Sequence, residues 1–264
     1  MIIDGKTVPN DEVIRSELCI IGGGVAGIGM ALQFIDSGVD VCLLEGGDFE
    51  LNARTKELAN GDNVGMPYYS LDDARPRYFG GGSNLWAGWC RPLDEIDFEK
   101  RDWVPYSGWP IDKRELDPYY DRAKKLCEIG DKSLEASDWE GAMPDLYQDP
   151  YASDGISTTV WGGSPPTRFG HQYRGALDDA QNIKVYLNSN VTRLVTDDLG
   201  KRVTDVCVAT LSQNRFKVQA KIFVLLPGAI EAARILLSST QGERQGIGNE
   251  HDVVGRYFMD HPHV

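Results

Sequence analysis

The chain has 264 residues, enough to bury a substantial core, so a peptide or a small disulfide-stapled scaffold is excluded. Its 27 lysines and arginines against 40 aspartates and glutamates leave a formal net charge of −13, which disfavours nucleic acid and anionic membrane surfaces as partners. With 41% hydrophobic and 25% charged residues, the composition is that of a folded globular protein.

The first predicted elements lie near the N-terminus. An apolar run at residues 17–21 predicts a strand that ends in three glycines, and residues 25–37 are typical of a helix closed by Gly38. A second apolar run at residues 39–44 predicts another strand. Strand, glycine turn, helix and strand make a βαβ unit, which predicts two neighbouring parallel strands.

The glycine turn carries the strongest local signal. Gly22, Gly24 and Gly27 have G-x-G-x-x-G spacing, and Glu45 follows 45 − 22 = 23 residues after the first glycine. Gly22 permits the turn, Gly24 lets the backbone approach a pyrophosphate, and Gly27 allows close packing of helix and strand. The helix start offers N–H donors to phosphate, and Glu45 accepts hydrogen bonds from ribose hydroxyls while repelling a 2′-phosphate. The pattern favours NAD or FAD over NADP, and the predicted contacts are Gly22, Gly24, Val25, Ala26, Gly27 and Glu45.

Residues 46–180 are rich in Gly, Pro, Trp and Tyr, and most of this zone is predicted to form ordered loops. One helix is clear, because Asp112 and Glu115 have the spacing of a capping box and the apolar period continues to about Ile129. Its apolar stripe comprises Leu116, Tyr119, Tyr120, Ala123 and Leu126.

A second glycine-rich segment spans residues 75–89, with the sequence RPRYFGGGSNLWAGW. Its glycines allow backbone N–H groups to approach another part of a large cofactor, and short polar side chains add donors. Because Trp86 and Trp89 are costly to expose, we expect a buried segment that faces a ligand rather than a surface hairpin. The candidate contacts are Gly80, Gly81, Ser83, Asn84 and Trp86.

The last third of the chain returns to regular structure. β-branched or alternating runs predict a β-meander feeding a final strand, at residues 183–187, 191–196, 203–210 and 216–226. The final strand breaks at Pro227-Gly228 and enters a helix at residues 229–237. Val191 and Gly228 join the candidate cofactor contacts.

The number and spacing of the cysteines are not typical of a cross-linked protein. They are odd in number and never form C-x-x-C, so neither a disulfide framework nor a zinc site is indicated for Cys19, Cys42, Cys90, Cys127 and Cys207. No other cluster has metal-binding spacing. The apolar runs are too short for a membrane span and no export signal is visible, so we expect a cytoplasmic protein.

Together these segments resemble the glucose–methanol–choline (GMC) family of FAD-dependent oxidoreductases. Residues 22–27 with Glu45 are similar to the family's FAD fingerprint, residues 79–89 to its flavin-side glycine segment, and residues 227–237 and 254–264 to two later motifs. The resemblance implies an α/β, Rossmann-like FAD-binding domain with a central parallel sheet, a β-meander and an irregular aromatic-rich cap. The corresponding divisions are 1–95 for the first part of the FAD-binding domain, 96–180 for the cap and 181–264 for the second part.

The resemblance is closest to the pyranose oxidase and glucoside 3-dehydrogenase side of the family. It implies oxidation of a CH–OH group of a sugar or glycoside, or another alcohol, by hydride transfer to flavin N5. Some members tether FAD through a histidine where this chain has Leu85, so the resemblance implies non-covalent FAD here.

The catalytic residues of the family do not match any part of this chain. The family's catalytic histidine and its partner lie in a region that would follow Val264, so we expect the chain by itself to be inactive. A neutral histidine is the usual proton acceptor, but the family pattern gives no such role to the histidines present, which are His171, His251, His261 and His263.

Two alternatives stay open. The chain could be a non-catalytic FAD-binding subunit of a split assembly, in which a partner chain supplies the C-terminal half. It could also be an NAD-dependent dehydrogenase that uses only the first fingerprint.

Overall fold

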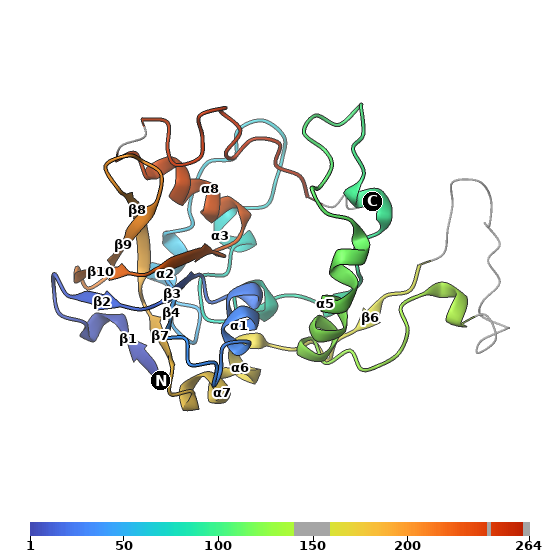
Figure 1. Ribbon diagram of the computed structural model, residues 1–264, viewed down its shortest axis with the longest axis horizontal. Coiled ribbons are helices and arrows are strands. Elements are labelled where there is room, and N and C mark those ends of the chain that lie inside the picture. Colours follow the sequence, from blue (N-terminus) through green and yellow to red (C-terminus); the bar gives the residue numbers. More distant parts are fainter. Residues whose placement is uncertain (140–158, 242–243, 261–264) are drawn as a thin grey trace. The chain divides into compact units, whose positions relative to one another are not determined.

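The computed structural model of the protein describes residues 1–139, 159–241 and 244–260 (Figure 1). The chain divides into two compact units, of which the first combines Met1–Leu85 with Arg168–Val264 and the second is Trp86–Thr167. The sequence-based division placed the middle segment at 96–180, so the second unit begins and ends earlier than that.

The first unit is built on a parallel five-stranded sheet. The strand order is β1 (Ile2–Asp4), β7 (Ile183–Leu187), β4 (Val41–Leu44), β3 (Leu18–Ile21) and β11 (Ile222–Leu225). Every residue of β3 and β4 is buried, as expected for central strands of a parallel sheet covered on both faces. Together with helix α1 (Val25–Leu32), they confirm the predicted βαβ unit.

Helix α1 is shorter than the sequence predicts. It ends at Leu32 instead of Ser37, because the N–H groups of Gln33 and Phe34 donate to carbonyls only three residues back, those of Met30 and Ala31. Such i→i−3 bonds tighten and terminate a helix.

A second, mixed sheet contains the meander. Its order is β2 (Val13–Arg15), β10 (Arg215–Gln219), β9 (Val203–Ala209) and β8 (Asn190–Thr196), with β2 parallel to β10 and the other pairs antiparallel. Two details of the prediction were wrong. The run 183–187 belongs to the parallel sheet, where it pairs with β4 and β1. The run 216–226 is two strands, because the chain leaves the mixed sheet after Gln219 and joins β3 in the parallel sheet at Ile222.

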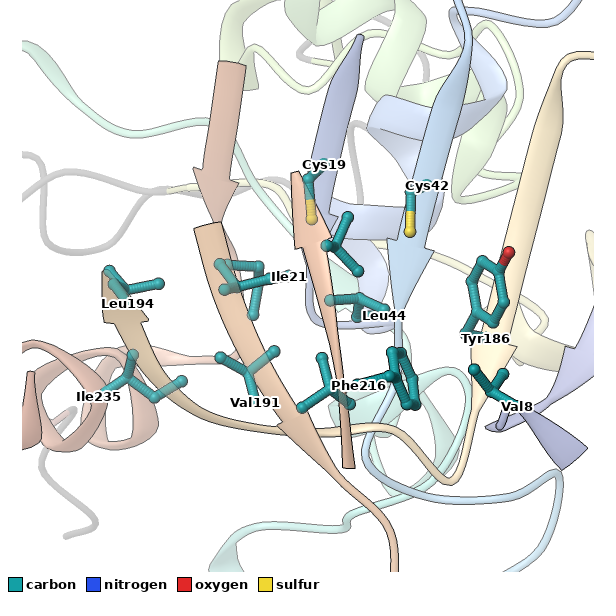
Figure 2. Close-up of a cluster of buried hydrophobic side chains, with 13 residues drawn as sticks. Val8, Cys19, Ile21, Cys42, Leu44, Tyr186, Val191, Leu194, Phe216 and Ile235 are labelled. Carbon is teal, nitrogen blue, oxygen red and sulfur yellow. The ribbon is translucent and has the colours of Figure 1, made fainter. Parts of the chain in front are cut away.

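The core of the first unit lies between the two sheets (Figure 2). Cys19 and Ile21 of β3, with Cys42 and Leu44 of β4, pack against side chains of the mixed sheet such as Phe216, and helix α8 (Ala229–Ser238) closes one side through Ile235. Helices α1, α6 (Phe169–Gln172) and α7 (Arg174–Asp179) cover the opposite face of the parallel sheet (Figure 1). The α/β fold with a parallel sheet and a β-meander is thus confirmed.

The remaining helices of this unit are short. They are η1 (Gly5–Thr7), α2 (Ala53–Glu57), α3 (Leu71–Ala74) and η2 (Gly81–Asn84). Strands β1 and β2, near the N-terminus, were not predicted, because runs of three residues carry too little pattern to be recognised.

The second unit contains one long helix, α5 (Lys113–Leu126). The predicted capping box is present, since the Glu115 N–H donates to the Asp112 carboxylate and the Asp112 N–H donates to the Glu115 carboxylate. The helix ends three residues before Ile129, and none of its residues is buried, so its apolar stripe does not pack into a core among the described residues.

The other described elements of the second unit are α4 (Glu95–Phe98), η3 (Ala136–Trp139) and a ribbon of β5 (Trp89–Cys90) with β6 (Gly162–Gly163). Trp89 is 67% exposed, contrary to the expectation of a buried segment, because its partner strand is glycine and offers no side chain to cover the indole. The ordered loops predicted at 140–158 lie outside the described residues. Within the described part of the chain, no helix has the length and apolar character needed to cross a membrane.

Candidate functional site

The first glycine turn links β3 to α1 without room for side chains. Gly22 has φ 112°, and a Cβ added to it would lie 2.4 Å from the Leu226 carbonyl oxygen. A Cβ on Gly27 would lie 1.8 Å from the Gly22 carbonyl oxygen. Both glycines are therefore required for the helix to start this close to the strand, as the fingerprint predicted.

Gly24 differs from its neighbours because the space beside it is open. Gly24 is the N-cap of α1 and has ordinary extended backbone, and no side-chain hydrogen bond caps the helix there. A Cβ added to Gly24 would meet nothing within 4 Å. Gly24, Val25 and Ala26 line a cavity of about 710 Å³. The first N–H groups of a helix have no intrahelical acceptor and carry partial positive charge, so this end of α1 suits a phosphate group.

Glu45 follows β4 directly and lines the same cavity. The side chain is buried, and its two carboxylate oxygens accept hydrogen bonds from the N–H groups of Gly47 (2.7 Å) and Gly23 (2.9 Å). Burial raises the pKa of Glu45, and these two bonds oppose the shift. Each carboxylate oxygen can accept a further bond, so the fixed carboxylate still has acceptor sites for sugar hydroxyls.

The second glycine segment meets the first. The Gly80 N–H donates to the Gly23 carbonyl at 2.8 Å, and a Cβ on Gly81 would lie 3.0 Å from the Gly24 Cα. The Ser83 hydroxyl is buried, where it donates to the Gly80 carbonyl (2.8 Å). It also accepts from the Phe169 N–H (3.1 Å). Ser83 therefore fixes the shape of the loop, and its glycines approach the N-terminus of α1.

A third turn completes the cavity wall. After β11, Pro227 and Gly228 lead into α8, and Gly228 has φ 89°, which favours glycine. The predicted contacts that line the cavity are Gly22, Gly24, Val25, Ala26, Glu45, Gly81, Val191 and Gly228. Those that do not are Gly27, Gly80, Ser83 and Asn84, which support the turns, and Trp86, which belongs to the second unit.

Sequence reasoning missed a charged cluster in the cavity wall. The buried Glu231 carboxylate pairs with the guanidinium groups of Arg234 (2.7 Å), Arg77 (3.1 Å) and Arg75 (3.5 Å). Burial alone would raise the pKa of Glu231, but the guanidinium groups of Arg234 and Arg77 outweigh it and hold that pKa below its usual value. Arg75, Arg77 and Glu231 of this cluster line the cavity, whereas Arg234 does not. Two short patterns in the sequence could have indicated this cluster. They are Arg-x-Arg at residues 75–77, before the second glycine run, and Glu-x-x-Arg at residues 231–234, in the helix after Gly228.

The rim of the cavity includes residues close to the C-terminus. The Tyr68 hydroxyl donates to the Asp260 carboxylate at 2.9 Å, and the rings of Tyr68 and Phe258 meet edge to face at 5.4 Å. All three residues line the cavity.

The family of this chain follows from a match of most of its length. Residues 17–242 match the family described as "FAD dependent oxidoreductase". The chain belongs to this family. Its relatives support the GMC type of these FAD-dependent oxidoreductases, and this chain corresponds to the N-terminal region of that type.

Two curated relatives and one solved structure illustrate the similarity. The 2-methyl-1,2-propanediol dehydrogenase of Mycolicibacterium austroafricanum is 24% identical over 94% of this chain and 55% of its own length. The fructose dehydrogenase large subunit of Gluconobacter japonicus is 23% identical over 97% of this chain and 60% of its own length. Formate oxidase of Aspergillus oryzae shares the fold, with a TM-score of 0.53 and 17% identity over 89% of this chain and 48% of its own. The chain therefore spans little more than half the length of the curated relatives it matches.

The cavity fits the cofactor of this family. Open space at Gly24 and the free N–H groups of the first turn of α1 suit the pyrophosphate, and the Glu45 carboxylate suits the adenosine ribose. The described histidines do not line the cavity. His171 and His251 are exposed and do not line the cavity, and His261 and His263 lie outside the described residues.

Proposed function

We propose that this chain forms the FAD-binding portion of an enzyme that oxidises a CH–OH group of a sugar or glycoside. The observation that carries the proposal is the convergence of three glycine turns, Glu45 and the N-terminus of α1 on one cavity. When bound, FAD supplies flavin N5 as the acceptor of a hydride from the alcohol carbon.

The residues of the cavity would act by binding and orientation. The N–H groups at Gly24, Val25 and Ala26 would hold the pyrophosphate, and Glu45 would fix the adenosine ribose. The guanidinium groups of Arg75 and Arg77, which line the cavity, would attract the phosphate groups of an anionic cofactor on a protein whose net charge is −13.

We assign the proton acceptor to sequence outside residues 1–264, in the part of the relatives that this chain does not match. A base near the substrate hydroxyl is needed for hydride transfer from an alcohol, and neither described histidine lines the cavity. Sequencing the gene beyond the codon for Val264 tests this. A continuing frame with a histidine-containing segment supports one longer enzyme, whereas a stop codon beside a second gene supports a split assembly.

The sugar substrate is supported by the resemblance to the pyranose oxidase side of the family and by the fructose dehydrogenase relative. Reduction of bound FAD by a panel of sugars, glycosides and simple diols, measured on the complete enzyme, tests the assignment. Reduction by diols alone would replace the sugar with a simple alcohol.

We also propose that FAD is bound without a covalent link, because Leu85 has no nucleophilic atom to attach to a flavin. Acid precipitation of the flavin-loaded protein should release all of the flavin into the supernatant. Flavin that stays with the pellet would contradict this proposal.

Binding of FAD is tested by titration, followed through quenching of flavin fluorescence. A Gly24→Ala substitution places a methyl group in open space within the cavity, so it should weaken FAD binding by roughly tenfold or more, equivalent to about 1.4 kcal/mol. Gly175→Ala is the matched control, since a Cβ there also meets nothing within 4 Å but Gly175 lies on α7, outside the cavity lining. Equal affinity in the two variants, or preference of the wild type for NADH over FAD, would overturn the cofactor assignment.

A further inference from the structure

Two cysteines of the second unit, 127 − 90 = 37 residues apart in sequence, are brought together by the fold. Cys90 ends β5 and stands opposite Gly162 in the antiparallel ribbon with β6. Cys127 follows directly on α5, and Ile129, two residues further, packs against Gly162, where an added Cβ would lie 2.5 Å from the Ile129 Cγ2. Gly162 therefore lies opposite Cys90 and also contacts Ile129, which is two residues from Cys127.

Hydrogen bonds fix the backbone on each side of this pair. The Ser164 N–H donates to the Gly88 carbonyl at 2.8 Å, which continues the ribbon next to Cys90. The Thr167 hydroxyl oxygen lies 2.6 Å from the Glu128 carboxylate and 3.2 Å from the Cys127 carbonyl oxygen, and the Thr167 N–H donates to the Ser164 hydroxyl at 2.8 Å. The two thiols are hydrogen-bonded to each other, and both cysteines are only half-buried, so small reagents can reach them.

We propose that Cys90 and Cys127 form a reversible disulfide when the protein meets a low-molecular-weight disulfide. The Cys90 thiolate attacks the reagent, forming a mixed disulfide and releasing one thiolate. The Cys127 thiolate then attacks the Cys90 sulfur, forming the protein disulfide and releasing the second. Both protein thiols are oxidised, the reagent disulfide is reduced, and the two protons lost by the protein appear on the two released thiols.

The order of attack follows from the environments of the two thiols. Burial raises the pKa of both, to about 12 for Cys127, while the hydrogen bond from Cys127 favours the thiolate of Cys90. Cys90 is therefore the first nucleophile. Because both thiols must lose a proton, oxidation should be slow at neutral pH and faster at pH 9 than at pH 7.

The other cysteines serve as internal controls. Cys19 and Cys42 are register partners on β3 and β4 and lie side by side in the core of the first unit (Figure 2), buried away from reagents. Cys207 is half-buried and contacts the Arg193 guanidinium at 3.5 Å, with no thiol beside it among the described residues. A reagent disulfide should leave the first pair reduced and form at most a mixed disulfide on Cys207.

The experiment uses the full chain treated with oxidised glutathione under native conditions at pH 8. The protein is then unfolded in acid, its free thiols are alkylated, and intact mass and peptide mapping locate the products. In wild type and in a Cys207→Ser control, we expect the loss of two thiols and a peptide cross-link between Cys90 and Cys127. Cys127→Ser should stop at a stable glutathione adduct on Cys90, and Cys90→Ser should form no cross-link.

Two outcomes would overturn the proposal. One is a folded wild-type protein in which Cys90 and Cys127 both stay reduced or carry separate glutathione adducts at pH 8 and pH 9. The other is a cross-link that also forms, with equal yield, when oxidation is carried out in denaturant, because the native fold would then contribute nothing to the pairing. Far-UV circular dichroism of each variant separates these results from misfolding.

Discussion

The two units of this molecule obtain order in different ways. The first buries apolar strands on both faces of a parallel sheet, and its core continues across to the mixed sheet. The second keeps Trp103, Tyr106 and Trp109 at least 60% exposed, and its longest helix has no buried residue. Its described part includes local bonds such as the capping box of α5 and the bond from the Thr167 N–H to the Ser164 hydroxyl. Long-range packing thus organises the first unit, and local hydrogen bonding is prominent in the second.

The sharpest test of this difference is Gly27→Ala. The new Cβ would lie 1.8 Å from the Gly22 carbonyl oxygen, and backbone at a buried turn cannot yield as a side chain does, so we expect a loss of about 3 kcal/mol or more. Urea unfolding measures the change. Gly175→Ala, at an open helical site, should instead leave stability unchanged or raise it by about 0.5–1 kcal/mol. Equal effects of the two variants would contradict the packing argument.

The charged cluster of the first unit should be the next most sensitive feature. Glu231→Gln removes the carboxylate that pairs with the guanidinium groups of Arg75, Arg77 and Arg234, and breaking a buried ion pair costs about 3–5 kcal/mol. Because Arg234 is nearly half exposed, the lower end is expected. Glu17→Gln, which removes the exposed partner of Lys221, is the control and should change the urea midpoint little.

The same carboxylate predicts a dependence of stability on pH. The pKa of Glu231 is lowered in the folded protein, so its stabilising effect is fully present above the unfolded value of about 4.5 and is lost as the pH falls through the folded pKa. The free energy of unfolding should therefore decrease from pH 5 downward, and the slope should be smaller in Glu231→Gln. Parallel slopes in the two proteins would assign the acid sensitivity to other carboxylates.

The smallest expected effect concerns the second unit. Asp112→Ala removes the N-cap of α5, so the first turn should fray while the sheets of the first unit are unaffected. Hydrogen exchange should accelerate in peptides covering the start of α5 only. Asp121→Ala, further along the same helix, is the matched control, because the Asp121 carboxylate makes a long contact of 3.9 Å with the Lys124 ammonium group. Faster exchange throughout the first unit would show that the two units are not independently ordered.

Some of the candidate site was accessible from sequence because its signals are local. The spacing of Gly22, Gly24 and Gly27 next to a strand predicts a tight turn and a helix start, and the structure shows both. Glu45 was found in the same way, from its position directly after the next strand. The arginines that surround Glu231 were not predicted, since no local pattern states that positions 77 and 231 are neighbours.

The sequence by itself determined the βαβ unit, the capped α5 helix and the glycine turns, because hydrophobic period, capping residues and positive-φ glycines act within a few residues. Only the tertiary structure decided that residues 216–226 divide between two sheets, that β7 pairs with β4, and that Cys90 meets Cys127. Strand partners and buried charge pairs depend on groups distant in the chain. Their choice is made by the packing of the whole unit, which local propensity does not encode.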